Sequence, residues 1–203
     1  MKRAVLASAN PGKLRELAAV LAPAGFELLA QTALGIDSVA ETGTTFLENA
    51  LIKARHAAAA ARLPALADDS GIEVDALGGR PGVWSARFAG AGASDAANLE
   101  RLLEELEGVP AARRTARYQC VVVWVRTADD PAPLTGTGTW EGRIALTPRG
   151  SGGFGYDPAF VPQGERRSAA ELSAAEKNRV SHRAQALARL VAALESAGVY
   201  SRP

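Results

Sequence analysis

The chain has 203 residues, of which 23 are basic and 22 acidic, and its formal net charge at pH 7 is +1. This near-balance argues against a protein that coats nucleic acid and against an acidic solvating chain. The hydrophobic fraction of 47% excludes a disordered chain, and the length favours a single domain over residues 1–203.

The chain contains one cysteine, Cys120, which excludes an intramolecular disulfide and argues against a cysteine-based zinc site. The N-terminal apolar run is broken at Asn10, which argues against a signal peptide. No stretch approaches the roughly 20 apolar residues of a membrane span. We therefore expect a cytoplasmic protein with neither a membrane nor a nucleic-acid partner.

Strand and helix patterns alternate along the chain. In order they predict a buried strand at residues 3–9, a helix at 13–21, a strand at 27–30, a helix from 45 to about 62, a strand at 65–68 with 72–74 as its candidate continuation, a helix at 95–107, a strand at 118–126, one or two strands within 135–146, and a final helix ending at 198. Thr45 and Ser173 each stand three residues before a glutamate, the capping-box spacing of a helix start. This order predicts an α/β protein whose mixed central β-sheet is flanked by helices.

The first candidate site is the turn between the first strand and the first helix. It consists of Ser8, Ala9, Asn10, Pro11, Gly12 and Lys13. A helix N-terminus presents free N–H groups and a positive dipole end, which suit a phosphate, and Lys13 adds a charge. The turn is not a P-loop, because that motif requires Gly at the position of Ala7 and Ser or Thr at the position of Leu14. An ordinary strand-to-helix turn is the alternative.

Asp68 and Asp69 follow the apolar strand, and Ser70 and Gly71 come next. Neighbouring side chains of an extended chain point to opposite faces, so the two aspartates are expected to have different roles. One could face a pocket while the other anchors the turn. A solvent-exposed loop is the alternative, because Asp, Ser and Gly all favour turns.

Glu41 precedes the long helix and could join Asp69 on a Mg²⁺ ion, since hard cations bind carboxylate oxygens. Lys53 lies further along that helix. Lysine is rare here, with four lysines beside 19 arginines, so a lysine points weakly to a place that requires a compact ammonium group. Coding bias is the alternative explanation for the small number of lysines, and a solvated side chain is the alternative for Lys53.

Residues 152–158 form a glycine-rich loop that contains Phe154, Gly155, Tyr156 and Asp157. Glycines allow the backbone to approach a ligand closely. The two aromatic rings could stack on a flat base, and Asp157 could accept hydrogen bonds from ring N–H groups. The loop is not the dinucleotide-binding pattern, which opens a helix after a strand.

Lys177, His182 and Arg183 form a donor-rich cluster suited to oxyanions or carbonyl groups. Lys177 and Arg183 are six residues apart, so one straight helix cannot place both on the same face. Either the helix breaks near Val180, or a ligand is contacted from two sides. The alternative is the solvated face of an amphipathic helix.

Five motifs, taken in chain order, resemble the inosine triphosphate pyrophosphatase family, and the resemblance extends from Val5 to about Leu194. The matching segments are residues 8–13, 45–50, 67–71 and 152–158, and 176–178 followed by 181–183. Ser8 stands where many members carry Thr, and this change keeps the hydroxyl group. Each motif is weak by itself, whereas five in family order are specific.

The resemblance implies two lobes with a substrate cleft between them, a homodimer, and Mg²⁺-dependent hydrolysis of ITP, dITP and XTP to the monophosphate and pyrophosphate. It implies that Asp69 is the general base and that Glu41 and Asp69 hold the metal. The residues it implies for substrate contact are Ser8, Ala9, Asn10, Pro11, Gly12, Lys13, Lys53, Ser70, Phe154, Gly155, Tyr156, Asp157, Lys177, His182 and Arg183. A related pyrophosphatase for other modified nucleotides and a non-catalytic nucleotide-binding regulator are the alternatives, and an intact Asp69 argues against the regulator.

Overall fold

The computed structural model describes residues 2–8, 14, 17–18, 21 and 25–199. Residues 9–13 of the predicted phosphate turn therefore lie outside the described residues. Leu14, Leu17, Ala18 and Leu21, all within the helix predicted at 13–21, are helical.

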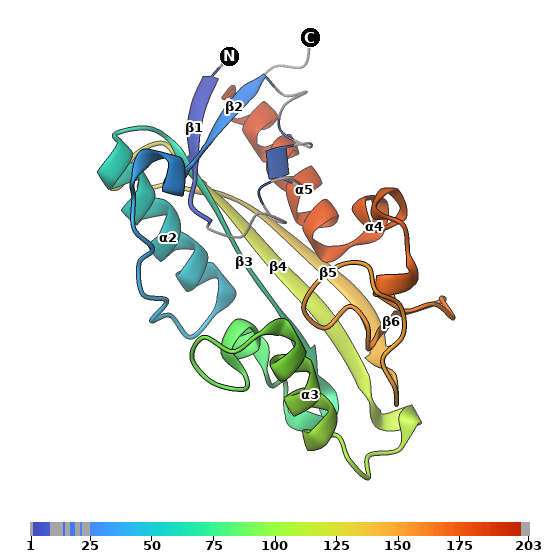
Figure 1. Ribbon diagram of the computed structural model, residues 1–203. Coiled ribbons are helices and arrows are strands. Elements are labelled where there is room, and N and C mark those ends of the chain that lie inside the picture. Colours follow the sequence, from blue (N-terminus) through green and yellow to red (C-terminus); the bar gives the residue numbers. More distant parts are fainter. Residues whose placement is uncertain (1, 9–13, 15–16, 19–20, 22–24, 200–203) are drawn as a thin grey trace. The chain divides into compact units, whose positions relative to one another are not determined.

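A six-stranded sheet in the order β2-β1-β3-β4-β5-β6 forms the centre of the fold (Figure 1). Its strands are β1 (Lys2–Leu6), β2 (Phe26–Ala30), β3 (Ala65–Val74), β4 (Thr115–Val125), β5 (Leu134–Ile144) and β6 (Phe160–Pro162). Strand β1 pairs in parallel with β2 and β3, whereas β5 and β6 are antiparallel. The predicted mixed sheet is therefore confirmed.

Four α-helices have bounds within the described part of the chain: α2 (Phe46–Ala61), α3 (Asp95–Glu105), α4 (Ala174–Val180) and α5 (His182–Ser196). Capping boxes at Thr45 and Ser173 begin α2 and α4 as predicted. The oxygen of each cap accepts a hydrogen bond from the backbone N–H three residues on, which satisfies one of the N–H groups that a helix start leaves free. Among these residues, no helix combines the length and apolar character that crossing a membrane requires.

Strand β3 differs from the predicted pattern, because it runs without interruption from Ala65 to Val74. Asp69, Ser70 and Gly71 are extended within it, and the neighbouring strands β1 and β4 lie on either side. The alternative of a solvent-exposed loop for this segment is therefore wrong. Strand β6 was not predicted, because three residues are too few to show a period.

The contacts divide the chain into two compact units. The first comprises the described residues within Met1–Asp69, Cys120–Gly138 and Arg183–Pro203, and the second comprises Ser70–Gln119 and Thr139–His182. Strands β3, β4 and β5 each contribute residues to both units. The single domain over residues 1–203 and the substrate cleft between two lobes stay predictions.

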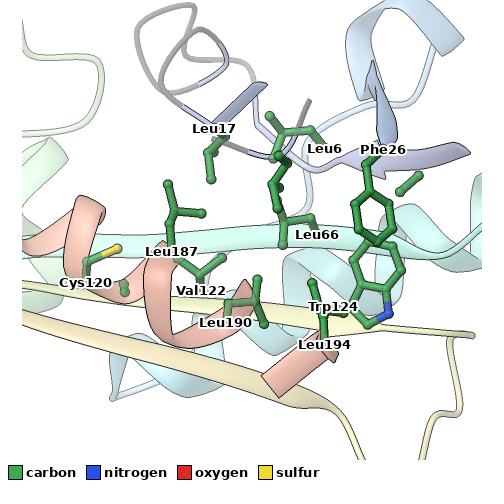
Figure 2. Packing of buried hydrophobic residues seen from close by; sticks show 13 residues of the cluster. Leu6, Leu17, Phe26, Leu66, Cys120, Val122, Trp124, Leu187, Leu190 and Leu194 are labelled. Atoms are coloured by element: carbon green, nitrogen blue, oxygen red, sulfur yellow. The ribbon is translucent and has the colours of Figure 1, made fainter. Parts of the chain in front are cut away.

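In the first unit, alternating strand residues pack against different helices. Leu66 belongs to a cluster with Leu187 and Leu190 of α5 (Figure 2), while Ala67 packs with Ala54 of α2. This is the period of two expected for a strand that is covered on both faces. Cys120 is buried in the α5 cluster, as predicted for a core cysteine.

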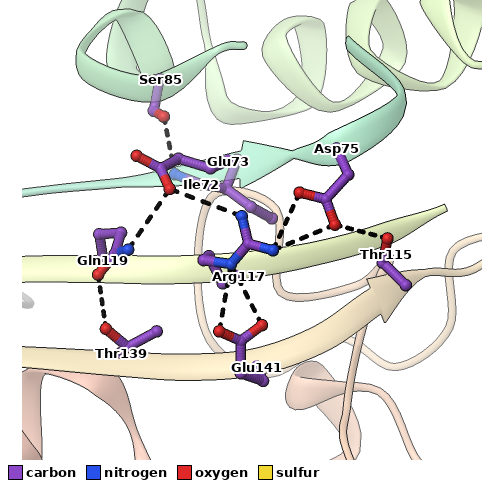
Figure 3. Close-up of polar contacts among 9 residues, drawn as sticks. All are labelled: Ile72, Glu73, Asp75, Ser85, Thr115, Arg117, Gln119, Thr139 and Glu141. Carbon is purple, nitrogen blue, oxygen red and sulfur yellow. Dashed lines mark hydrogen bonds and ion pairs between the residues drawn. The ribbon is translucent and has the colours of Figure 1, made fainter. Parts of the chain in front are cut away.

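In the second unit, the two faces of the strands differ in polarity. Even-numbered residues such as Ile72 and Tyr118 join an apolar cluster. Odd-numbered residues form a polar network in which Arg117 binds Asp75 at 2.9 Å and Glu141 at 3.2 Å (Figure 3). The core of this unit therefore lies on the even-numbered face.

Candidate functional site

Three predicted residues of the first unit form one cluster, in which two carboxylates bind the ammonium group of Lys53. Lys53, in the middle of α2, donates hydrogen bonds to Oε1 of Glu41 at 2.7 Å and to Oδ1 of Asp69 at 3.1 Å. Asp69 lies on the same side of β3 as Ala67, the side that packs against α2. Only 14% of the Lys53 side chain is exposed, so the alternative of a solvated lysine is wrong.

The charges in this cluster stabilise the protonated form of Lys53. Burial opposes the charge, but the carboxylates of Asp69, Asp68 and Glu41 outweigh that effect and raise the pKa of Lys53 above its usual value of 10.5. Lys53 is therefore a fixed positive charge at neutral pH, held between two carboxylates.

The loop that carries Glu41 is fixed by Asn49 of α2, which is fully buried. Oδ1 of Asn49 accepts a hydrogen bond from the backbone N–H of Gly43 at 2.8 Å. A Cβ atom at Gly43 would lie 2.6 Å from Cβ of Glu48, so a larger residue does not fit there. Asn49 lies in one of the sequence motifs, but this role is not visible in the sequence because the bond spans six residues and crosses a helix start.

The oxygen donors of Glu41 and Asp69 fit a divalent metal. Both carboxylates already bind one cation, the Lys53 ammonium group, and Mg²⁺ is usually held by one or two carboxylates together with waters and substrate phosphates. Over the parts of the chain that the structure describes, no group of three or more His, Cys, Asp or Glu side chains could hold a metal ion. The pair would therefore leave most coordination positions to water or substrate.

Asp68 and Asp69 have different partners, as predicted from the alternation along a strand. Oδ2 of Asp68 lies 3.5 Å from Nε of Arg183 at the start of α5, and both side chains are almost completely buried. Arg183 was expected to contact substrate, whereas the structure places it in a buried ion pair. Its contact with substrate stays a prediction.

A second group of predicted residues lies in the second unit and is organised around Asp157. The Asp157 side chain is 2% exposed. Its Oδ2 accepts hydrogen bonds from Nζ of Lys177 at 2.5 Å and from the backbone N–H of Phe154 at 2.9 Å. The Lys177 ammonium group also lies 4.7 Å from the centre of the Phe154 ring. The loop and α4 are therefore joined through one buried carboxylate.

The two aromatic residues of the glycine-rich loop have different environments. Phe154 is half-buried, whereas Tyr156 is 4% exposed and its hydroxyl donates to the carbonyl oxygen of Ser85 at 2.7 Å. Burial, and next the charge of Asp95, raise the pKa of Tyr156. This burial corrects the expectation that both rings could stack on a base, because the Tyr156 ring belongs to the core of its unit. Gly155 donates its N–H to Asp95 at 2.8 Å.

Of the two alternatives for this segment, the structure shows the helix break near Val180. Helix α4 ends at Val180, Ser181 is extended, and α5 begins at His182. The imidazole of His182 is 4% exposed and stacks on the ring of Tyr118, with centroids 4.6 Å apart and planes 7° apart. In the sequence Tyr118 marks only a strand, and no local signal indicates its contact with His182, 64 positions later.

Ser8 and Ser70 are the other described candidates. Both side chains are half-buried. Ser8 follows β1, and its backbone N–H donates to Leu6 at 2.9 Å; Ser70 lies next to Asp69 in β3. Their roles as substrate contacts stay predictions.

Comparison with known proteins shows the family to which this chain belongs. The model of the Ham1 family matches residues 4–193. A dITP/XTP pyrophosphatase of Methylococcus capsulatus is 57% identical over 96% of this chain and 97% of that protein, and one of Escherichia coli K12 is 53% identical over 97% and 100%. The solved structure of a HAM1 protein from Coxiella burnetii superposes with a TM-score of 0.90 at 47% identity, covering 97% of this chain and 100% of the other. The chain belongs to the Ham1 family.

Proposed function

We propose that this chain hydrolyses non-standard purine nucleoside triphosphates, namely ITP, dITP and XTP, to the monophosphate and pyrophosphate. The observation that carries the proposal is the cluster of Glu41, Lys53 and Asp69, which combines a candidate base, a fixed cation and a pair of carboxylates that could hold a metal. The names of the relatives in Methylococcus and Escherichia support the choice of substrate.

Asp69 is the proposed general base. It takes a proton from a water molecule as the water oxygen attacks the α-phosphorus, the bond from that phosphorus to the bridging oxygen breaks, and pyrophosphate leaves. Lys53 fixes the Asp69 carboxylate at 3.1 Å and offsets part of the phosphate charge. Mg²⁺, which Glu41 and Asp69 would hold, would supply further charge neutralisation and make a nearby water more acidic. That help is needed because an ordinary aspartate, with a pKa of about 3.9, is a weak base at neutral pH.

We assign the purine base to Phe154 and Lys177 in the second unit. The Phe154 ring is a flat apolar surface of the kind on which bases stack. The Lys177 ammonium group is a hydrogen-bond donor that complements a 6-oxo group. The amino group of adenine would place a donor against this donor and leave buried groups unpaired, which disfavours ATP.

The test is a product assay with Mg²⁺ and a panel of ITP, dITP, XTP, GTP, ATP and dUTP. We expect pyrophosphate from the first three nucleotides, and no turnover when EDTA removes the metal. Release of orthophosphate would refute attack at the α-phosphorus, and equal turnover of ATP and ITP would refute the 6-oxo argument. Faster turnover of dUTP than of ITP would favour a pyrophosphatase for other nucleotides, and binding without turnover would favour a regulator.

We also propose a homodimer located in the cytoplasm. The family resemblance supports the dimer. The single cysteine, which is buried and free, fits a reducing compartment. The near-neutral net charge fits a protein without polyanionic partners. Light scattering after size exclusion measures the mass of the assembly directly, and a mass of one chain would refute the dimer.

A further inference from the structure

We propose that Tyr118 of β4 is a positioning residue for substrate binding, because its ring holds the imidazole of His182 and its hydroxyl holds the carboxylate of Asp157. The inference rests on the proposed function, since His182 and Asp157 are candidates for that substrate site. It adds a residue that none of the five sequence motifs contains. Tyr118, His182 and Asp157 all belong to the second unit.

The ring of Tyr118 fixes the plane of the His182 imidazole. The two rings are stacked, with centroids 4.6 Å apart and planes only 7° apart. The Tyr118 ring is held in turn by Phe160, which meets it edge-on at 4.7 Å, and Trp140 lies in a stacked arrangement 6.5 Å away. His182 is the first residue of α5, directly after the extended Ser181, and its ring also lies in a stacked arrangement with Trp140, with centroids 6.4 Å apart. The stack on Tyr118 therefore limits the orientation of the imidazole plane.

The hydroxyl of Tyr118 acts on a different group. It donates a hydrogen bond to Oδ1 of Asp157 at 3.3 Å. The other oxygen of the same carboxylate accepts from Lys177 and from the backbone of Phe154. With one oxygen fixed by Tyr118, the second is oriented toward Lys177 and the loop. A single side chain thus links the glycine-rich loop, α4 and the first residue of α5.

Core packing alone does not require a tyrosine at this position. Ala116, which shares this face of β4, is apolar and fully buried, and Cys120 is buried as well. Tyr118 itself is only 7% exposed, so its hydroxyl is costly unless it is hydrogen-bonded. A phenylalanine would fill the same space without that cost. The hydroxyl is therefore accounted for by Asp157.

The first variant is Tyr118→Phe, which keeps the ring and removes only the hydroxyl. We expect KM for ITP to rise about tenfold, because a hydrogen bond to a charged group is lost and the Asp157–Lys177 pair is less well oriented. We expect kcat to change by less than about twofold, because Glu41, Lys53 and Asp69 are untouched. A residue that only stabilises the fold would not separate KM from kcat in this way.

The second variant is Tyr118→Leu, which also removes the stack. The chain has only two histidines, His56 and His182, so labelled histidine gives two resolvable NMR signals, and a His56→Gln variant assigns them. We expect the His182 ring-proton signal to move downfield in Tyr118→Leu and to stay in place in Tyr118→Phe. The matched control is Phe26→Leu, which removes a buried aromatic ring that packs against Trp124 in the first unit.

The outcomes separate this inference from the proposed function. An unchanged KM in Tyr118→Phe, or an equal rise of KM in Phe26→Leu, would overturn the positioning role. An unmoved His182 signal in Tyr118→Leu would overturn the stack. A wild-type protein that hydrolyses none of the nucleotides would refute the proposed function instead, and the NMR comparison would still decide whether Tyr118 holds His182.

Discussion

Replacing Lys53 by methionine should lower stability and turnover together. Methionine keeps a long unbranched side chain but removes the charge. Glu41 and Asp69 then lose the ammonium group that binds them at 2.7 and 3.1 Å, and Asp68 adds a third negative charge nearby. Two neighbouring carboxylates without a cation repel each other, so the folded state is penalised.

The size of the penalty follows from the exposure of the cluster. The side chains of Lys53, Glu41 and Asp69 are 14%, 25% and 9% exposed. Breaking a fully buried ion pair costs about 3–5 kcal/mol, whereas exposed pairs contribute about 0–1 kcal/mol. We expect a loss of about 2 kcal/mol in the free energy of unfolding, which lowers Tm by about 4–8 °C for a chain of this length.

The contribution of the Lys53 charge to stability depends on pH in a defined way. Burial opposes the charge of Lys53, but Asp69, Asp68 and Glu41 raise its pKa above that of the unfolded chain. Its stabilising contribution is therefore fully present below the unfolded pKa and is lost as the pH rises through the folded pKa. The stability difference between the wild type and Lys53→Met should stay constant near neutral pH and shrink in alkaline solution, above about pH 10.4.

Urea unfolding at several pH values, together with ITP hydrolysis, tests this reasoning. The matched control is Lys2→Met on β1, where the lysine is exposed. We expect kcat/KM for ITP to fall about 10²–10³-fold in Lys53→Met, as for the loss of one electrostatic contact to reacting phosphates, and to be unchanged in the control. If both variants unfold at the same urea concentration and both keep full turnover, the cluster has neither the structural nor the catalytic role assigned to it.

Three further substitutions test other parts of the molecule. Asp69→Asn should lower kcat by about 10²–10⁴-fold and keep nucleotide affinity in a calorimetric titration; unchanged turnover would remove Asp69 as the base. Asp68→Asn removes the negative charge that faces the buried Arg183 and should cost about 3 kcal/mol in urea unfolding, partly recovered by adding Arg183→Met; a loss below that of an exposed ion pair would contradict the buried pair. Gly153→Ala should unfold earlier than Gly155→Ala, because both glycines have positive φ but only at Gly153 would a Cβ meet a buried carboxylate oxygen, at 2.1 Å; equal stability of the two would refute the clash.

Local signals in the sequence predicted local structure well. The capping boxes at Thr45 and Ser173 each need only four consecutive residues, and both are confirmed. The alternation of Asp68 and Asp69 follows from strand geometry alone, and the two side chains do have different partners. A helix break near Val180 was one of two alternatives, because one straight helix cannot place Lys177 and Arg183 on the same face, and the structure shows that break.

Contacts between distant segments could not be predicted in this way. Tyr118 and Asp157 are 39 residues apart, and nothing in the sequence around either residue indicates that their side chains meet. The burial of Tyr156 depends on a carbonyl group of Ser85 in another loop, 71 residues away. The continuity of β3 through Asp69 and Ser70 depends on the strands beside it, which override the turn preference of those residues.

The pairing of charges explains why the net charge of +1 does not reveal the candidate site. Lys53 forms ion pairs with Glu41 and Asp69, and Lys177 forms one with Asp157. Each ammonium charge is thus balanced by a neighbouring carboxylate. In the sequence these partners lie 12 to 20 residues apart, so a count over any short window misses the pairing. An anionic ligand has to compete with these carboxylates for the ammonium groups. Affinity for a triphosphate therefore depends on how the carboxylates are oriented and on the ions they bind, and it cannot be deduced from the number of basic residues.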